Sequence, residues 1–382
     1  MVDNNKTKVL VGISGGVDSA VAAYLLLKQG YDVTGAFMRN WDSMANNDVL
    51  GNPTLNDDQC SQEVDYADAK AVASLLGIQL LRVDFIEEYW DHVFLHFLEE
   101  YQVGRTPNPD IFCNKYIKFD AFLTYAKKRG FDYIATGHYA KKVVKDGRAD
   151  LLKAHDLNKD QTYFLSQLSQ YQLAAALFPL GNLPKEEVRQ IAHDLNLKSV
   201  MDKKDSTGIC FIGERNFKQF LTNYLPAHQG DIVDINNNRV LGKHDGVLYY
   251  TIGQRRGLGI GGIAGEEAKG WFVVNKDVEK NILYVASGDE DAYLYSNKAI
   301  IKVANWINKR PRDGAHLSAK FRYRQADQRV TLTHIDETTF MLAYPQGVKA
   351  VTPGQAAVIY DGDICLGGGI IDEVYRDDKK MM

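Results

Sequence analysis

The sequence predicts an α/β protein built from a parallel-sheet domain, a small mixed central domain and a C-terminal β-barrel. Three observations support this class. Strand-like runs alternate with helical patterns in the first half of the 382 residues, glycines and hairpin signals dominate later, and the last section has closely spaced strands without a convincing helix. We expect the three domains at residues 1–213, 214–293 and 294–382.

The first domain alternates between expected strands and expected helices. The strands are short apolar or β-branched runs at Lys8 to Ile13, Asp32 to Phe37, Gln79 to Phe85 and Tyr133 to Thr136. The helical patterns lie between them, at Asp18 to Gln29, Ser61 to Leu76 and Ile86 to Tyr101. This order favours a mainly parallel sheet covered by helices on both faces, with ligands at the carboxyl ends of the strands.

The segments that follow depart from this alternation. Asn40 to Asp58 is rich in Asn, Asp, Gly and Pro and is expected to be a loop, which in this position could act as a mobile lid. Further helices are expected at Gln161 to Phe178 and at Pro184 to Leu195. From Gly230 onward short strands are expected, and Ser296 to Val374 predicts a small closed or Greek-key barrel.

The turn between the first strand and the first helix is typical of a phosphate-binding loop. Its glycines let backbone N–H groups approach an anion, its serines add hydroxyl donors, and the following helix points its positive end at the same place. It has neither the Walker lysine nor the G-x-G-x-x-G pattern. Its residues are Gly12, Ile13, Ser14, Gly15, Gly16, Val17, Asp18 and Ser19.

The Ser-Gly-Gly-Val-Asp-Ser core of this loop resembles the pyrophosphate loop, or PP-loop, of the N-type ATP pyrophosphatases. The resemblance implies an adenine nucleotide alpha hydrolase-like fold, cleavage of ATP between its α and β phosphates, and adenylation of a substrate. Asp18 would suit a magnesium ion that bridges phosphate oxygens. An ordinary glycine-rich turn between strand and helix is the alternative interpretation.

A second group of candidate residues follows the helical pattern that ends near Tyr101. Two prolines bracket Asn108, and Asp110 is expected to cap a helix with Cys113 in its first turn. A thiol at the start of a helix has a lowered pKa, and Lys115 would lower it further, so Cys113 is a candidate reactive thiolate. The alternative is a buried cysteine that acts only as a small hydrophobic residue.

The four cysteines, Cys60, Cys113, Cys210 and Cys365, lie far apart, which gives no zinc pattern and no framework of secreted disulfides. Cys210 falls in a turn, Asp205 to Gly213, between helical and strand-like regions. If the fold brings Cys210 to Cys113, the pair would suit sulfur chemistry, because one thiol can carry a persulfide while the other resolves it through a disulfide. The sequence alone does not show that they meet.

Composition and charge are those of a soluble globular protein, with 45% hydrophobic and 25% charged residues and a net charge of −4. No apolar run reaches the roughly 20 residues that span a bilayer, and the polar start is not a signal peptide, so we expect a cytoplasmic protein without a membrane partner. Basic and aromatic residues are nevertheless interleaved at 306–312 and 320–329. Such stretches suit phosphate contact and base stacking, or else the solvated face of a barrel.

Six motifs together are similar to those of the tRNA-specific 2-thiouridylase family. They occur in the family's order, and the resemblance covers nearly the whole chain. The stretch from Asp42 to Gln59 is not diagnostic. The motifs lie at residues 14–19, 106–119, 135–140, 159–165, 205–213 and 250–258.

The resemblance implies replacement of the C2 oxygen of the anticodon wobble uridine by sulfur. ATP, with Mg²⁺, would adenylate the uridine at O2, and sulfur would then displace AMP. Family positions imply that residues 12–19 hold the ATP phosphates and that Met38 and Gly137 line the nucleotide pocket. Cys210 would carry a persulfide received from a cysteine desulfurase or a persulfide relay protein, Cys113 would be the nucleophile that releases its sulfur, and Asp110 would be the acid–base group.

The same resemblance implies positions that contact the tRNA. An enzyme that acts on a base edge must take the base out of its stack, and Asn108, Pro109 and Asp110 would receive it. The other implied tRNA contacts are His138, Lys159, Asp160, Gln161, Arg322, Tyr323 and Gln355.

Two other functions remain open from the residues alone. A PP-loop synthetase could adenylate a small molecule, in which case the thiols would not be needed. A non-catalytic RNA-binding module could use the loop only to hold a nucleotide. Release of pyrophosphate in the presence of tRNA would exclude the second function, and turnover of ATP to AMP without tRNA and without Cys113 and Cys210 would favour the first.

Overall fold

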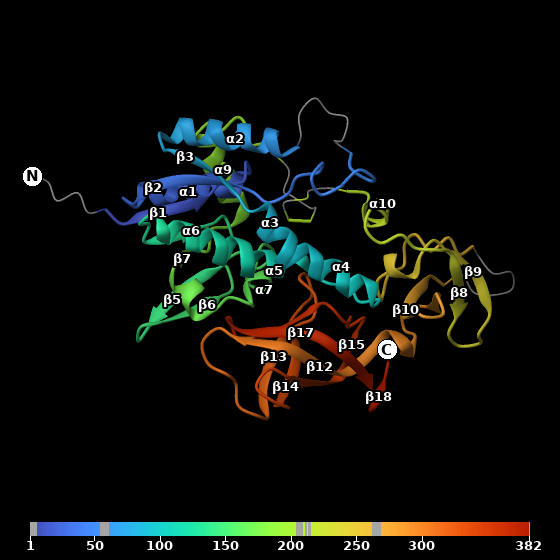
Figure 1. Ribbon diagram of the computed structural model, residues 1–382. Coiled ribbons are helices and arrows are strands. Elements are labelled where there is room, and N and C mark those ends of the chain that lie inside the picture. The colour runs from blue at the N-terminus through green and yellow to red at the C-terminus, as the bar shows by residue number, and fades with distance from the viewer. Residues whose placement is uncertain are drawn as a thin grey trace, which may run out of the picture.

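The computed structural model describes residues 6–53, 61–203, 209, 210, 212, 215–261 and 269–381. Figure 1 shows a parallel sheet with its helices in blue and green, a mixed sheet in yellow at the right, and a barrel in orange and red below. Cys60 lies outside the described residues, as does most of the segment 205–213 around Cys210. The α/β class with a C-terminal barrel is confirmed.

The parallel sheet contains the four predicted strands and a fifth, in the order β3-β2-β1-β4-β7. Every neighbouring pair in it runs parallel. The strands are β1 (Lys8–Gly12), β2 (Asp32–Arg39), β3 (Leu80–Asp84), β4 (Tyr133–Ala135) and β7 (Ala176–Leu177). Since all five point the same way, their carboxyl ends form one edge, where the phosphate loop of residues 12–19 lies.

Side chains alternate along the strands, so each face of the sheet is covered by different helices. Val11 and Phe37 pack on one face with Ala69, whereas Leu10 packs on the other face with Phe122. Figure 1 shows α2 and α6 on opposite sides of the sheet. The helices of this region are α1 (Val17–Lys28), α2 (Ser61–Leu76), α3 (Ile86–Tyr89), α4 (Leu95–Gln102), α5 (Pro109–Phe112), α6 (Phe122–Lys128) and α9 (Lys185–Asp194).

Two of these helical stretches contain π-helix. The segment η1 (Trp90–Phe94) joins α3 to α4 within the single helix predicted from Ile86 to Tyr101, and η2 (Cys113–Ala121) joins α5 to α6. A π-helix has i→i+5 hydrogen bonds and is often found at functional sites. No sequence pattern predicted either segment.

The single helix predicted from Gln161 to Phe178 is wrong. The chain forms α7 (Thr162–Leu165), α8 (Gln170–Ala174) and then strand β7. Ser169 explains the break, because its side chain accepts a hydrogen bond from Gln172 N (3.2 Å) while the Gln172 side chain accepts one from Ser169 N (2.9 Å). This reciprocal capping box starts a new helix, and the residues after it pair with β4.

Six strands form the predicted barrel, in the order β12-β15-β14-β13-β16-β17, and pairing of β12 with β17 closes it. Phe321, Phe340 and Ile359 are among the buried side chains that fill it. The strands are β12 (Tyr295–Trp306), β13 (Ala315–Lys320), β14 (Gln328–His334), β15 (Phe340–Lys349), β16 (Ala356–Asp361) and β17 (Ile364–Arg376), with β18 (Lys379–Lys380) beside β17.

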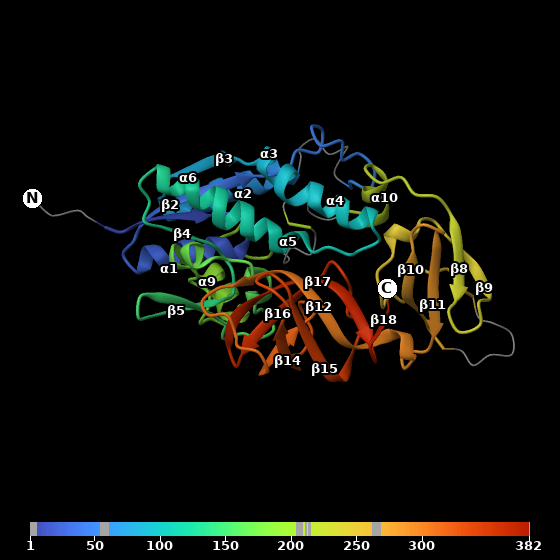
Figure 2. The same ribbon diagram turned by 60° about the horizontal axis from the view of Figure 1, so that its bottom comes forward.

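A hairpin from the first half of the chain extends this barrel sheet. Strands β5 (Lys141–Lys145) and β6 (Arg148–Leu152) are joined by Asp146 and Gly147, both with positive φ, and β6 pairs with β17. The sequence signals predicted the turn but not the pairing. Figure 2 shows the green β5 beside the barrel, which is thus tied directly to the domain that holds the phosphate loop.

The central region is a four-stranded sheet in the order β10-β11-β8-β9, with α10 (Phe217–Thr222) before it. The hairpin signal at Asn236 to Asn238 lies between β8 and β9, as predicted. The strands are β8 (Gly230–Asp234), β9 (Val240–His244), β10 (Trp271–Asp277) and β11 (Ile282–Ser287), and two short 3₁₀ turns are η3 (Val247–Tyr249) and η4 (Ala292–Leu294). Among the helices that the structure describes, none combines the length and apolarity needed to cross a membrane.

Lys276 on β10 should make the stability of the protein depend on pH. Its ammonium nitrogen lies 2.9 Å from the carbonyl oxygen of Tyr250, and burial lowers its pKa from 10.5 to about 7. Between these two values the unfolded chain binds a proton that the folded chain does not, so folding becomes more favourable as the pH rises. Below about pH 7 the folded protein carries Lys276 as a charged, buried lysine, and the full free-energy cost of this charge lowers its stability.

Lys276→Met removes this cost. The free energy of unfolding of the variant, from urea titrations, should exceed that of the unsubstituted protein near neutral pH, and the difference should shrink as the pH approaches 10.5. Lys243→Met on β9 is the control, because Lys243 is an exposed lysine paired with Asp231. A difference that stays constant with pH would contradict the explanation.

Candidate active site

The phosphate loop leaves β1 and enters α1 with its backbone held by two serines. Ser14 N donates to Ser19 Oγ (3.1 Å), and Ser19 Oγ donates to the carbonyl oxygen of Gly16 (3.0 Å). Gly15 has a φ of +74°, and a Cβ there would lie 2.4 Å from the carbonyl oxygen of Asp65. No side chain caps the first turn of α1, so the N–H groups at this helix start remain suited to an anion.

Asp18 is already paired with protein groups. The ammonium of Lys185 lies 2.7 and 2.8 Å from its two carboxylate oxygens, and the hydroxyl of Tyr139 donates to one of them at 2.8 Å. Among the described residues no cluster of three His, Cys, Asp or Glu side chains could hold a metal ion. Both carboxylate oxygens of Asp18 are therefore engaged by protein groups, and a contact of Asp18 with magnesium on the ATP phosphates stays a prediction.

Lys203 connects the phosphate loop to α2. Its ammonium donates to the carbonyl oxygen of Gly15 (3.0 Å) and to the carboxylates of Asp65 (2.6 Å) and Asp68 (2.9 Å). The chain runs from Lys203 towards Cys210, so this contact joins the loop to the segment that leads to the thiol.

The two residues expected at the nucleotide do lie beside the loop. A Cβ on Gly137, just after β4, would be 2.8 Å from both Asp18 C and Ser19 N, and a Cβ on Gly12 would be 3.0 Å from Met38 Cε. Met38 also packs, partly buried, against the main hydrophobic core. The structure therefore places Gly137 and Met38 against the phosphate loop.

The segment around Asn108 starts a helix differently from the prediction. Asn108, not Asp110, is the N-cap of α5, and its Oδ1 accepts a hydrogen bond from Asp110 N (3.2 Å). Asp110 instead accepts a hydrogen bond from the backbone N–H of Cys210 (3.1 Å). Burial raises the pKa of the Asp110 carboxyl, although this hydrogen bond and Lys118 oppose the shift.

The fold brings the two candidate thiols together. Cys113 Sγ and Cys210 Sγ lie 3.5 Å apart, both cysteines are free, and the hydroxyl of Tyr89 donates to the carbonyl oxygen of Cys210 (2.9 Å). Cys113 is completely buried, whereas Cys210 is partly exposed. The separation is within reach of a disulfide after a small movement, since a disulfide bond is about 2 Å long.

The prediction of a lowered pKa for Cys113 is wrong. Burial, together with the hydrogen bond to Cys210, raises the pKa of the Cys113 thiol well above its usual value, which outweighs its place near a helix start. The hydrogen bond from Cys113 and the charge of Lys118 instead lower the pKa of Cys210. Lys115 is not the activating cation, because its ammonium contacts Gln167 Oε1 (3.4 Å).

Three of the expected tRNA contacts have structural partners within the protein. His138 is buried, its Nδ1 lies 2.8 Å from Thr136 Oγ1, and burial lowers its pKa well below the usual value. Asp160 is buried and accepts hydrogen bonds from Ala154 N (2.9 Å) and Thr162 Oγ1 (2.7 Å). Gln161 Oε1 accepts one from Tyr139 N (2.9 Å).

Gln355 and Tyr323 bring the barrel to the candidate site. Gln355 Nε2 donates to the carbonyl oxygen of Thr106 (2.7 Å), and Thr106 N donates to the carbonyl oxygen of Pro353 (3.0 Å). The Tyr323 ring lies 4.4 Å from the ring of Phe164 on α7. The barrel thus holds the segment that leads into Asn108.

The Arg322 side chain is half-buried, and its guanidinium group contacts other protein groups. One guanidinium nitrogen lies 2.8 Å from the carbonyl oxygen of Ile252, 2.9 Å from that of Ala350 and 3.1 Å from Thr352 Oγ1. Burial lowers its pKa. These partners belong to the central region and the barrel, so Arg322 joins two parts of the fold.

We therefore expect Arg322→Ala and Lys309→Ala to behave differently. Lys309 is exposed, and removing a phosphate contact there should reduce the salt dependence of tRNA affinity by about one unit of log–log slope. Arg322→Ala should instead lower the thermal stability and leave that slope unchanged, because the lost bonds are internal. Filter binding at several salt concentrations with parallel thermal unfolding distinguishes the two. A one-unit loss of slope for Arg322→Ala with unchanged stability would contradict its internal role.

The described part of the predicted lid is packed against α10. Asp48 and Arg215, both almost fully buried, form an ion pair at 2.8 Å, and Trp41 Nε1 donates to the same Asp48 oxygen (3.0 Å). Tyr224 donates to the carbonyl oxygen of Asn46 (2.8 Å). Residues 40–53 are therefore a docked loop and not a free lid.

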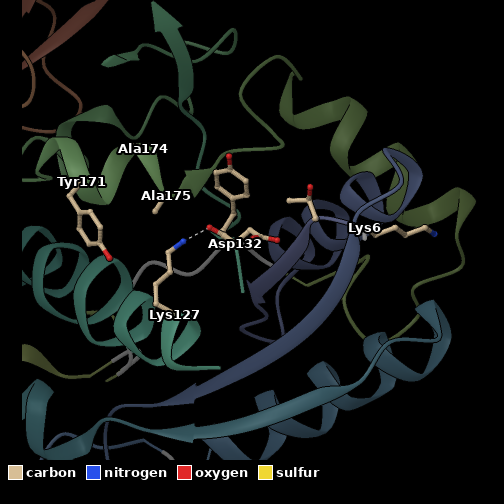
Figure 3. Close-up of a pocket in the computed structure, with 8 residues that line it drawn as sticks. Lys6, Lys127, Asp132, Tyr171, Ala174 and Ala175 are labelled. Atoms are coloured by element: carbon tan, nitrogen blue, oxygen red, sulfur yellow. Dashed lines mark hydrogen bonds between the residues drawn. The ribbon is translucent and has the colours of Figure 1, made fainter. Parts of the chain in front are cut away.

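A separate pocket of about 550 Å³ lies at the opposite, amino-terminal edge of the parallel sheet. Figure 3 shows Lys127 and Tyr171 beside it, with the Lys127 ammonium directed at the carbonyl oxygen of Asp132 (2.5 Å). The phosphate loop and the thiols belong to the carboxyl edge, so this pocket is not part of the candidate site. Its lining is Lys6, Thr7, Lys127, Asp132, Tyr133, Tyr171, Ala174 and Ala175.

Sequence reasoning did not single out several residues that complete the site. Tyr89, Lys185 and Lys203 lie outside the six motifs, and Tyr139 lies in the motif at 135–140 without having been given a role. Lys118 lies in a motif that the sequence analysis quoted, but α-helical spacing does not place it beside Cys113.

Comparison with known proteins covers almost the whole chain. Family models match residues 7–214 (tRNA methyl transferase HUP domain), 218–287 (tRNA methyl transferase PRC-barrel domain) and 296–371 (aminomethyltransferase beta-barrel domain). The chain is 58% identical over 381 residues to the tRNA-specific 2-thiouridylase MnmA of Mycoplasma capricolum, covering 97% of this chain and 100% of that protein.

Two further relatives carry the same name. The protein of Acholeplasma laidlawii is 55% identical over 377 residues, covering 99% of each chain, and that of Staphylococcus carnosus is 52% identical over 378 residues, covering 98% of each. Identity at this level over the full length, together with the matched domains, establishes the relationship. The chain belongs to the tRNA-specific 2-thiouridylase family.

Proposed function

We propose that this protein is a tRNA uridine 2-sulfurtransferase, which uses ATP to replace the C2 oxygen of the anticodon wobble uridine with sulfur. The observation that carries the proposal is the pair of free thiols, Cys113 and Cys210, whose sulfur atoms lie 3.5 Å apart. The backbone N–H of Cys210 is also hydrogen-bonded to the buried Asp110. Both thiols belong to the domain that carries the phosphate loop. An ATP site and a sulfur site within one domain are what an activated thiolation needs.

In the first step the uridine oxygen is converted into a good leaving group. Uracil O2 attacks the α-phosphorus of ATP, a bond to AMP forms, and the bond to pyrophosphate breaks. Residues 12–19 would hold the phosphates, with Met38 and Gly137 beside the nucleotide. Asp110 would take the N3 proton, for which its raised pKa suits it. Any magnesium would arrive on the ATP phosphates, because Asp18 is paired with Lys185.

In the second step sulfur is loaded on Cys210. Its thiolate attacks the terminal sulfur of a persulfide on the sulfur donor, a cysteine desulfurase or a relay protein. A new S–S bond forms on Cys210, the donor's S–S bond breaks, and the donor leaves as a thiolate. The lowered pKa and partial exposure of Cys210 fit it for this attack.

In the third step Cys113 releases the sulfur. Its sulfur bonds to Cys210 Sγ, the terminal sulfur leaves as HS⁻ with the Cys113 proton, and a disulfide remains. HS⁻ adds to C2 of the adenylated uridine, the C2–O bond breaks, and AMP leaves with the proton held by Asp110. The proton on sulfur ends on N3. A dithiol reductant supplies two electrons and two protons to restore both thiols.

The tRNA would lie across the domains that we place at residues 1–213, 214–293 and 294–382, and the reaction would take place in the cytoplasm. Asn108, Pro109 and Asp110 would receive the flipped uridine. The remaining implied positions would surround it, some through direct contact and some by holding the loops that touch the tRNA: His138, Lys159, Asp160, Gln161, Arg322, Tyr323 and Gln355.

The experiment that tests the proposal is mass spectrometry of tRNA nucleosides. Unmodified tRNA is incubated with the protein, ATP, magnesium and a persulfide donor, and 2-thiouridine and AMP should form in equal amounts. ATP turnover without tRNA, or turnover with tRNA but no 2-thiouridine, would contradict the proposal. The first outcome would instead favour a synthetase that adenylates a small molecule.

A further inference from the structure

The π-helix η2 places Lys118 on the same face as Cys113. In an α-helix, with 3.6 residues per turn, positions five apart are separated by about 140° around the axis. Hydrogen bonds from i to i+5 widen the turn and bring such positions onto the same side of the helix. Cys113 and Lys118 are five positions apart, and η2 runs from Cys113 to Ala121.

Lys118 lies in a group of polar side chains from four separate segments. Lys118 shares η2 with Cys113, whose Sγ lies 3.5 Å from Cys210 Sγ, and its charge interacts with those of Cys210 and Asp110. His138, at the end of β4, is close enough for the charge of Lys118 to affect it. The Asp110 carboxylate accepts a hydrogen bond from Cys210 N, and the Tyr89 hydroxyl donates one to the carbonyl oxygen of Cys210.

The charges in this group explain which protonation states coexist. Burial lowers the pKa of Lys118, but its interactions with Cys210, Cys113 and Asp110 outweigh burial and raise it. His138 stays neutral beside this cation, since burial and Lys118 both lower its pKa. The positive charge of Lys118 also lowers the pKa of Cys210.

We propose that Lys118 is a positioning residue that holds Cys210 as a thiolate, oriented for attack on the incoming persulfide, and that the π-helix exists at this place to deliver it. The inference rests on the proposed function for the role of Cys210. In the loading step Lys118 would first pair with the thiolate and then with the Cys210 persulfide anion, so the charge next to it does not change when the S–S bond forms.

The test measures the thiol directly and needs neither tRNA nor ATP. The full chain is alkylated with iodoacetamide over a range of pH, and labelling of Cys210 is followed by mass spectrometry. Lys118→Met should raise the midpoint of Cys210 labelling by about one to three pH units, the size of the effect of a nearby opposite charge. Lys118→Arg keeps the charge and should keep the midpoint low.

Lys115→Met is the matched control. Lys115 lies on the same π-helix, but its ammonium contacts Gln167 and lies 5.1 Å from the Tyr116 ring centre, so its loss should leave the midpoint unchanged. An unchanged midpoint in Lys118→Met, or an equal rise in Lys115→Met, would overturn the proposal.

If Lys118→Met does not fold, a second variant tests the same proposal. Cys113→Ala retains Lys118 but removes the side chain that donates a hydrogen bond to Cys210. If Lys118 holds the thiolate, the Cys210 midpoint stays below the ordinary value of about 8.5. A midpoint at that value would assign the effect to Cys113 alone. Failure to form 2-thiouridine would reject the proposed function but would not change the pH midpoints of Cys210 labelling. The proposed function and the role of Lys118 can therefore fail separately.

Discussion

Cys210→Ser is expected to abolish 2-thiouridine formation while tRNA binding remains. The variant has no thiolate that can take a sulfur atom from a persulfide donor, and a serine hydroxyl cannot replace it. AMP formation in the presence of tRNA should continue for at least one turnover, because the adenylation step does not involve the thiol. Nucleoside mass spectrometry, a pyrophosphate assay and tRNA gel shifts measure the three quantities.

Cys113→Ser should fail one step later. Cys210 should gain the mass of one sulfur atom on incubation with the donor, and that sulfur should stay on the protein, because the thiol 3.5 Å away that would release it is missing. Intact-protein mass spectrometry detects the trapped persulfide. A variant at either cysteine that thiolates tRNA at the unsubstituted rate would refute the role assigned to that cysteine.

Cys365→Ala provides the control for loss of a thiol. Cys365 is buried where β17 meets the β5–β6 hairpin, its Sγ lies 3.8 Å from the carbonyl oxygen of Thr162, and burial raises its pKa to about 12. It is therefore expected to be unreactive. Its replacement should lower stability through the small cavity it leaves, and 2-thiouridine should still form.

The second large effect is expected from Gly137→Ala. The new Cβ would lie 2.8 Å from two backbone atoms, Asp18 C and Ser19 N, at the start of α1. Backbone atoms cannot move aside as a flexible side chain can, so β4 and the phosphate loop must separate. A displacement on the order of 1 Å at a reacting group costs about a hundredfold in rate. AMP formation should fall by that factor while tRNA affinity is retained.

Gly242→Ala is the matched control for this substitution. Gly242 lies on β9, and an added Cβ there meets no atom within 4 Å. Its AMP formation should equal that of the unsubstituted protein. If Gly137→Ala also retained full adenylation, the nucleotide would not lie against this part of the loop. A matching loss of tRNA affinity and thermal stability would point to misfolding instead.

Local patterns were sufficient for much of the fold. Strand β1 was predictable from its apolar run, the phosphate loop from its glycines and serines, and α2 from its apolar spacing. Each depends on neighbours within one turn or one strand. The helix predicted across Ser169 failed for a related reason, since an apolar pattern continued through a capping box that breaks the helix.

Charge and reactivity were much less predictable from local patterns. Cys113 was expected to be the thiolate because it follows a helix start, but complete burial raises its pKa, and Cys210 has the lower pKa. Lys115 was closer in sequence than Lys118, yet the π-helix turns Lys118 towards the thiols. Arg322 was placed on a basic surface, although its guanidinium bonds to two carbonyl groups inside the protein.

The residues alone, read in order, were enough to establish the α/β class, the barrel, the phosphate loop and the kinship with 2-thiouridylases, because periodicity and motif spacing are properties of short segments. The meeting of two distant thiols, the choice of the ionised one, the pairing of Asp18 with Lys185 and the docking of the β5–β6 hairpin arise only when the chain is folded. Desolvation and Coulomb interactions depend on which segments surround a group, and neighbours that are remote along the chain do not leave a local pattern.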